Sequence, residues 1–297
     1  MDLEVNLTLV KLEPNKSSRR KDVAWTHRKL AAILEKQKKP VEAVFAYRAS
    51  AEILAWQARL TPEDADVQDD LSVSHQQLGD LLFETAAYKD AIASYQNFFA
   101  SCQTLEQLAP DKTKWKRFAA VAQNSMGDSL VRLKRHDDAR AAYTVAVALG
   151  KDLLQVEPGN TAVKNNLALT YQSIGGVRLA QDNGAAAEAA FKTALDLQYE
   201  RVAQEPDKVQ SVRNAAWTER KIAEILLAQD ASPVRPETAD AAAARLTSAR
   251  YALVALAARA DAEQCGPGKL VSQPVDGACH DCLSGAGGGG AMNCPLR

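Results

Sequence analysis

The sequence predicts an all-α fold, in which helical hairpins repeat along the chain and stack into an α–α superhelix. The first observation is that five similar stretches begin at residues 22, 70, 118, 166 and 214, each 48 residues after the one before. The second is that apolar residues inside a unit recur at helical spacing. The third is composition: alanine is abundant and only 6% of residues are aromatic, which favours helices over sheets.

Four columns of residues keep this register, and chance does not hold four independent columns in step over such a length. One column is proline, at Pro14, Pro62, Pro110, Pro158 and Pro206. Another is alanine, at Ala43, Ala91, Ala139 and Ala187. The third is aromatic, at Tyr47, Tyr95, Tyr143 and Phe191. The last is apolar, at Leu30, Leu78, Met126, Ile174 and Ile222.

Each unit is predicted to form two helices joined by a short turn. In the second unit the first helix covers 70–84, where four residues share one face at i, i+4, i+7 and i+11: Leu71, His75, Leu78 and Leu82. The second helix covers about 88–108 and carries four residues on one side: Ala91, Tyr95, Phe98 and Leu105. Pro40 suits the first position of a helix, and the recurring proline ends the second helix.

The repeats divide the chain into three regions. Residues 1–21 are a remnant of a preceding repeat, 22–263 are the array, and 264–297 are a tail. The array contains five units: 22–69, 70–117, 118–165, 166–213 and a divergent cap at 214–263. Residues 3–12 align with the end of a second helix whose first helix is absent. We therefore expect either missing upstream sequence, which we favour, or a partner that covers the bare face.

The tail is rich in glycine, lacks apolar periodicity and is predicted to be disordered. It holds four of the five cysteines, and Cys279 and Cys282 have the spacing of a zinc half-site. Cys265, Cys294 and His280 could complete the ligands, but a metal site needs a scaffold to orient its ligands. We favour a tail without a metal site.

Charge and motifs argue against several function classes. The chain has 36 basic and 37 acidic residues, whereas a nucleic-acid binder would show a basic stripe. No apolar run is long enough for a membrane span, and the N-terminus lacks the layout of a signal peptide. We expect a cytoplasmic protein with neither a membrane nor a nucleic-acid partner. No catalytic or phosphate-binding motif occurs, which predicts a protein that is not an enzyme and needs no cofactor or metal.

The first helix and the start of the second resemble the tetratricopeptide repeat (TPR). That family places a small residue, usually glycine, before an alanine and an aromatic residue at fixed spacing. Three units match with Gly79, Gly127 and Gly175, and the first unit has Ala31 at the same position. The small residue lets the two helices of a hairpin approach each other. The family's usual unit is shorter, so the chain is most similar to the long-unit TPR arrays of bacteria.

The resemblance implies a peptide-binding surface on the first helices, at the family's second, fifth, ninth and twelfth positions. The residues that we expect to bind a peptide are Trp25, Arg28, Val73, Gln76, Asp80, Phe83, Val121, Asn124, Asp128, Leu169, Gln172, Trp217 and Arg220. The same columns also contain Ala32, Glu35, Val131, Gly176, Leu179, Glu224 and Leu227. An alternative interpretation is that the polar members only contact neighbouring first helices. No carboxylate-clamp pattern is present, so a C-terminal carboxylate ligand is not specifically indicated.

The resemblance therefore predicts a scaffold that binds a peptide segment of a protein partner in a concave groove. The alternative is a regulatory or sensory TPR region of a longer bacterial signalling protein, such as a Ser/Thr kinase. Self-association through the N-terminal edge is a further possible interaction, because that edge lacks a preceding repeat.

Overall fold

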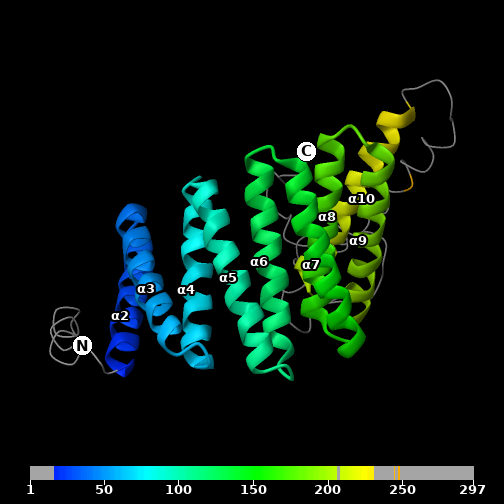
Figure 1. Cartoon of the computed structure of the whole chain (residues 1–297). Helices are drawn as coiled ribbons and strands as arrows, with labels where there is room; N and C mark the ends of the chain where they lie inside the picture. The colour runs from blue at the N-terminus through cyan, green and yellow to red at the C-terminus, as the bar shows by residue number, and fades with distance from the viewer. Residues whose placement is uncertain (1–16, 206–207, 231–243, 245–246, 248–297) are drawn as a thin grey trace, which may run out of the picture. The chain divides into compact units, whose positions relative to one another are not determined.

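The computed structural model describes residues 17–205, 208–230, 244 and 247. Within these residues the chain is entirely helical, with nine helices and no strand (Figure 1). The helices are α2 Ser17–Lys36, α3 Pro40–Leu60, α4 Ala65–Glu84, α5 Tyr88–Leu108, α6 Thr113–Arg132, α7 His136–Val156, α8 Thr161–Ala180, α9 Gly184–Gln204 and α10 Val209–Asp230. The fold is thus the predicted all-α array of helical hairpins. None of these helices is long and apolar enough to cross a membrane.

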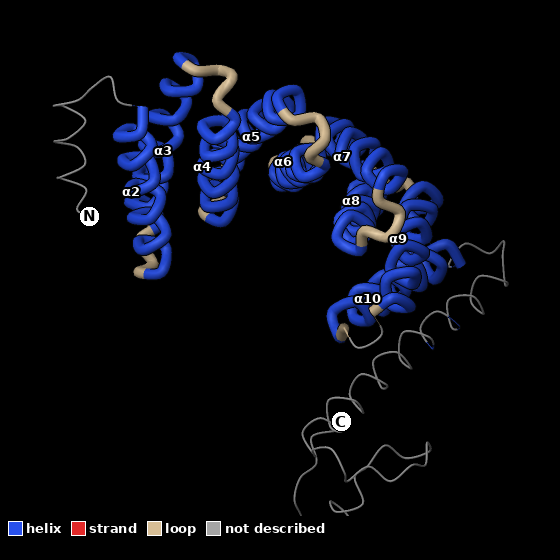
Figure 2. The backbone as a smooth tube through the Cα atoms, turned by 90° about the horizontal axis from the view of Figure 1, so that it is seen from below, coloured by secondary structure: helices blue, strands red, loops and turns tan. Residues whose placement is uncertain are grey.

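The chain divides into two units, residues 1–197 and 198–297, which are described separately. In the first unit, α2 packs against α3, α4 against α5 and α6 against α7, and α6 also contacts α4 and α8. Figure 2 shows that α4, α6 and α8 lie along the inner side of this array, whereas α5 and α7 lie along its outer side. The second unit contains the end of α9 and α10, joined by a hydrogen bond of 2.8 Å from Thr218 Oγ1 to Gln198 Oε1.

In the first repeat, Pro40 begins α3 as expected. In the second repeat, α5 has the bounds that the sequence predicts for its second helix. The first helix differs, because α4 begins at Ala65 rather than at residue 70. The reason is a helix cap: the Asp64 carboxylate accepts hydrogen bonds from the backbone N–H groups of Asp66 and Val67. Such a cap satisfies donors that the first turn of a helix leaves free.

The turn inside each hairpin follows one pattern, in which a residue other than glycine adopts a positive φ. These residues are Lys38, Ala86, Lys134 and Asp182. At Ala86, the amide of the following Ala87 donates to Leu82 O at 2.8 Å, and Ala86 itself donates to Phe83 O at 3.0 Å. This pair of bonds is the Schellman motif, which closes the carbonyl end of a helix. The sequence did not reveal it, because glycine usually marks that position.

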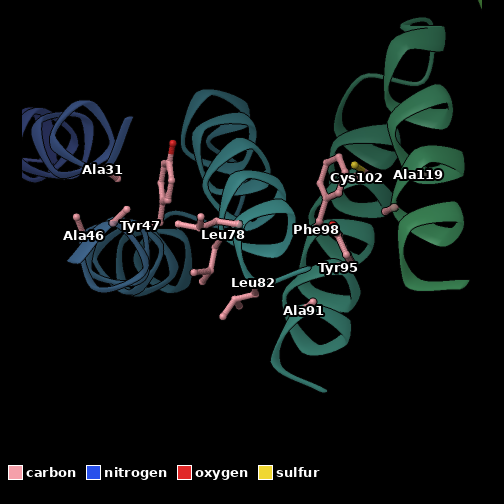
Figure 3. Close-up of a cluster of buried hydrophobic side chains, with 13 residues drawn as sticks. Ala31, Ala46, Tyr47, Leu78, Leu82, Ala91, Tyr95, Phe98, Cys102 and Ala119 are labelled. Atoms are coloured by element: carbon pink, nitrogen blue, oxygen red, sulfur yellow. The ribbon is translucent and has the colours of Figure 1, made fainter. Parts of the chain in front are cut away.

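The core of each hairpin is a small residue packed against an aromatic ring. A Cβ atom added to Gly79 would lie 2.7 Å from Tyr95, and one added to Gly175 would lie 2.8 Å from Phe191. At Gly127 the corresponding ring, that of Tyr143, would be closer still. The second hairpin belongs to a cluster that also includes Tyr47, and Figure 3 shows Phe98 and Cys102 beside Ala119. The glycines are therefore required by contact with the ring.

Several sequence predictions fall outside the described residues. These are the remnant up to residue 16, almost all of the cap beyond residue 230, and the tail with its cysteines.

Candidate peptide-binding face

The predicted binding residues lie on the first helices, and their exposure differs from unit to unit. Trp25 on α2 is 54% exposed, and Lys29 Nζ lies 5.2 Å from the centre of its ring. Leu169 on α8 is also exposed. Val73 and Val121 are half-buried. Within residues 198–297, Trp217 on α10 is exposed, and Arg220 Nε lies 3.4 Å from Glu224 Oε1.

The structure brings three predicted residues of two neighbouring hairpins to one cavity. Asp80 and Phe83 come from α4 and Asp128 comes from α6. The cavity has a volume of about 300 Å³ and is completed by Glu84, Tyr95 and Ser125. The spacing of Asp80 and Phe83 placed them on one helical face. Only the packing of α4 beside α6 adds Asp128 to the same site.

The acidic residues of this site accept hydrogen bonds from the core tyrosines. Tyr95 Oη donates to Asp80 Oδ1 at 2.8 Å, and Tyr143 Oη donates to Asp128 Oδ1 at 2.5 Å. Each carboxylate therefore joins the two helices of its own hairpin. The family positions alone indicated a ligand role and did not reveal this structural one.

The first and fourth hairpins vary this pairing in a consistent way. In the first, Ala32 replaces the aspartate, and Tyr47 Oη donates instead to Glu35 Oε2 at 2.6 Å. In the fourth, the ring is Phe191, which has no hydroxyl, and Gly176 stands at the aspartate position. Hydroxyl and carboxylate are thus present together or absent together. In the second, third and fourth hairpins this co-occurrence was visible in the sequence columns, whereas the acceptor of Tyr47 in the first hairpin, Glu35, stands in a different column.

Burial sets the protonation of these groups. Asp80 and Asp128 are exposed as whole residues, but their carboxylates are partly shielded from water, which raises the pKa of both above the usual value. The hydrogen bonds from the tyrosines oppose this rise. Burial, followed by the nearby aspartate charge, raises the pKa of Tyr95 and Tyr143. The tyrosines remain protonated donors at neutral pH. No group of His, Cys, Asp and Glu in the described part of the chain is arranged to hold a metal ion.

The polar fifth-position column has contacts between neighbouring first helices. Arg28 Nη1 on α2 lies 3.2 Å from Asp70 Oδ1 on α4. Two repeats later, at the equivalent positions, Asn124 and Asn166 border a narrow cavity of about 10 Å³ between α6, α7 and α8. Within the described residues, Asn124 Oδ1 is buried there without a hydrogen-bond partner. These contacts are of the kind that the alternative interpretation describes, and the peptide-binding role of Arg28 and Asn124 stays a prediction. Gln76 and Gln172 are half-buried.

No family model and no curated protein sequence matches the chain. Among solved structures, BtubC (BKLC) from P. vanneervenii is 15% identical over 92% of this chain and 94% of its own, with a TM-score of 0.49. MamA residues 41 to the end, from Desulfovibrio magneticus RS-1, is 15% identical over 78% and 96%, with a TM-score of 0.41. The apo form of RapI is 11% identical over 84% and 69%, with a TM-score of 0.44. These likenesses are remote, whereas the helix contacts described above show the all-α array directly.

Proposed function

We propose that the chain is a non-catalytic scaffold of the long-unit bacterial TPR type, which binds a peptide segment of a protein partner on the inner, first-helix face. The observation that supports this most is the cavity of about 300 Å³ at which Asp80, Phe83 and Asp128 meet. It offers one aromatic surface and several hydrogen-bond acceptors, a combination that suits recognition of an extended peptide.

The exposed ends of the face extend the proposed surface. Trp25 and Leu169 present apolar area on either side of the cavity region. Large aromatic side chains are frequent anchors in protein interfaces. The peptide would therefore run along α2, α4, α6 and α8, with its polar groups near Asp80 and Asp128.

The test uses amide truncation on the inner face. Gln76→Ala with Asn124→Ala should weaken binding of a partner peptide, first isolated by pull-down with the full chain, by about 1–3 kcal/mol if both amides pair with it. The matched control is Gln96→Ala with Gln103→Ala, two exposed amides on the second helix α5. Because Asn124 borders a repeat contact, thermal melting must show that the fold is retained. Unchanged affinity in the inner-face variant would move the binding site elsewhere.

The N-terminal edge supports a second proposal, self-association of the chain. Ile33 on α2 is 52% exposed, whereas Leu81 and Val177 at the same register position are buried. Phe45 on α3 is exposed as well. Sedimentation at increasing protein concentration should show a dimer, and Ile33→Lys with Phe45→Lys should shift it to monomer. A monomer at every concentration would contradict the proposal.

A further inference from the structure

A second and larger groove lies on the opposite side of the first helices, between the second helices α3 and α5. Its volume is about 860 Å³, and the floor is formed by α4. The α3 side of the lining runs from Arg48 to Pro62, and the α5 side runs from Asp90 to Thr104. On α5 all fifteen residues from Asp90 to Thr104 are helical and extend about 21 Å, or four turns. The groove shares no residue with the inner-face cavity described above.

The walls of the groove consist of small or short side chains. Ala51 and Ala55 line it on α3, and Asn97 and Ser101 line it on α5. In the next junction, between α5 and α7, the corresponding positions 48 residues later carry larger residues: Phe99, Gln103, Val145 and Leu149. Phe99 and Leu149 pack against the core cluster there. The small side chains that leave the first junction open are therefore replaced by larger ones at the second junction.

The floor combines apolar area with one polar group. Leu71, Leu78 and Leu82 are nearly completely buried beneath the groove. His75 lies among them, and its Nδ1 atom is buried without a hydrogen-bond partner in the described part of the chain. Burial lowers the pKa of His75 to about 4, so the imidazole is neutral near pH 7. A neutral imidazole leaves the floor of the groove without a net charge.

The rim of the groove carries charges of both signs. Glu52 and Arg59 are exposed on α3, and neither forms an ion pair among residues 17–205 and 208–230. They are seven residues apart, which places them on the same side of the helix, two turns from each other. At the other end, Arg48 Nη2 lies 3.9 Å from Asp90 Oδ2 across the groove. Glu52 and Arg59 are thus available to charges on an incoming molecule.

These features fit a helix better than an extended strand. Strand addition needs a sheet edge with free backbone groups, whereas both walls here are helices. Short alanine and serine side chains let another helix approach closely, and helices pack by inserting ridges into such grooves. We propose that this groove binds one α-helix of a protein partner. That helix has a basic and an acidic side chain two turns apart, facing Glu52 and Arg59, with small residues between them.

The test uses a displayed library of sixteen-residue, alanine-rich helical peptides, selected on the full chain. Peptides that bind a variant with a filled groove are removed by counter-selection. This variant carries Ala55→Gln with Ser101→Leu, the side chains that Gln103 and Leu149 provide at the next junction. Enriched peptides should carry the charge pair at seven-residue spacing and bind the filled variant at least ten-fold more weakly. Enriched peptides that lack the pair, or that bind the filled variant equally well, would overturn the proposal.

A rim variant keeps the test independent of groove filling. Arg59→Glu alters only an exposed side chain, so the fold is retained. It should weaken an enriched peptide at least five-fold, and changing the acidic residue of that peptide to lysine should restore binding to Arg59→Glu. Lys151→Glu, an exposed charge reversal on α7 outside the groove, is the matched control. An equal loss in Lys151→Glu would show a general charge effect and contradict a site at this rim.

Discussion

The third and fourth hairpins use the same backbone contact but differ in the chemistry that surrounds it. In both, a glycine of the first helix meets an aromatic ring of the second. The third adds a hydrogen bond from Tyr143 to Asp128, and the fourth has Phe191 with Gly176 at the aspartate position. The glycine is therefore required because the aromatic ring packs against it, whereas the carboxylate is required only where the ring carries a hydroxyl that needs an acceptor. The two requirements are separable.

The largest expected effect comes from the glycine. Gly127→Leu would place side-chain atoms inside the Tyr143 ring, so the helices must separate, and we expect a loss of about 3 kcal/mol in the free energy of unfolding. The matched control is Gly176→Ala. No atom lies within 4 Å of a Cβ added there, and alanine should stabilise the helix by about 0.5–1 kcal/mol. Urea denaturation followed by circular dichroism measures both; equal responses at the two sites would remove the distinction between them.

A smaller expected effect is a pH dependence of stability that the second hairpin has and the third lacks, because, of these two, only the second carries a histidine at this position. The pKa of His75 is lowered to about 4 by burial, whereas the unfolded value is near 6.5. Between these values the unfolded state binds more protons, so stability falls as pH decreases from about 6.5 towards 4 and is constant above. Between pH 7 and pH 5 the loss should be about 1–2 kcal/mol. His75→Gln, with the residue of the third hairpin at this position, Gln123, should remove this part of the dependence. An unchanged pH profile in that variant would assign it to other groups.

The smallest effect concerns the hydroxyl alone. Tyr143→Phe removes the hydrogen bond to Asp128 but keeps the ring, as Phe191 does in the fourth hairpin, so the free energy of unfolding should decrease by about 1 kcal/mol. Tyr171→Phe is the control, because the half-buried Tyr171 hydroxyl has no hydrogen bond within the described residues. Equal losses in chemical denaturation of the two variants would mean that the bond contributes nothing specific.

The sequence was sufficient for the hairpins because their signals are local. The spacing of Gly79, Tyr95 and the prolines predicted the helices and their contact, since both depend on short-range geometry. The site was predicted less completely. Whether Asn124 faces a peptide or a neighbouring repeat depends on how α6 and α8 pack, and no spacing within one helix contains that information. The groove beside His75 depends on side-chain sizes in two separate hairpins. The sequence indicates the groove only when equivalent positions of neighbouring junctions, such as Ala55 and Gln103, are compared for side-chain size.

The tyrosine hydroxyl and its carboxylate acceptor form one unit, which each hairpin of the array includes or omits as a pair. The most direct test transfers this unit to the fourth hairpin. Phe191→Tyr alone buries a hydroxyl without its acceptor and should destabilise the protein by about 1–3 kcal/mol. Adding Gly176→Asp supplies the acceptor, and the double-mutant cycle should give a favourable coupling of about 1 kcal/mol. A coupling of zero, with the two single changes simply additive, would contradict the account.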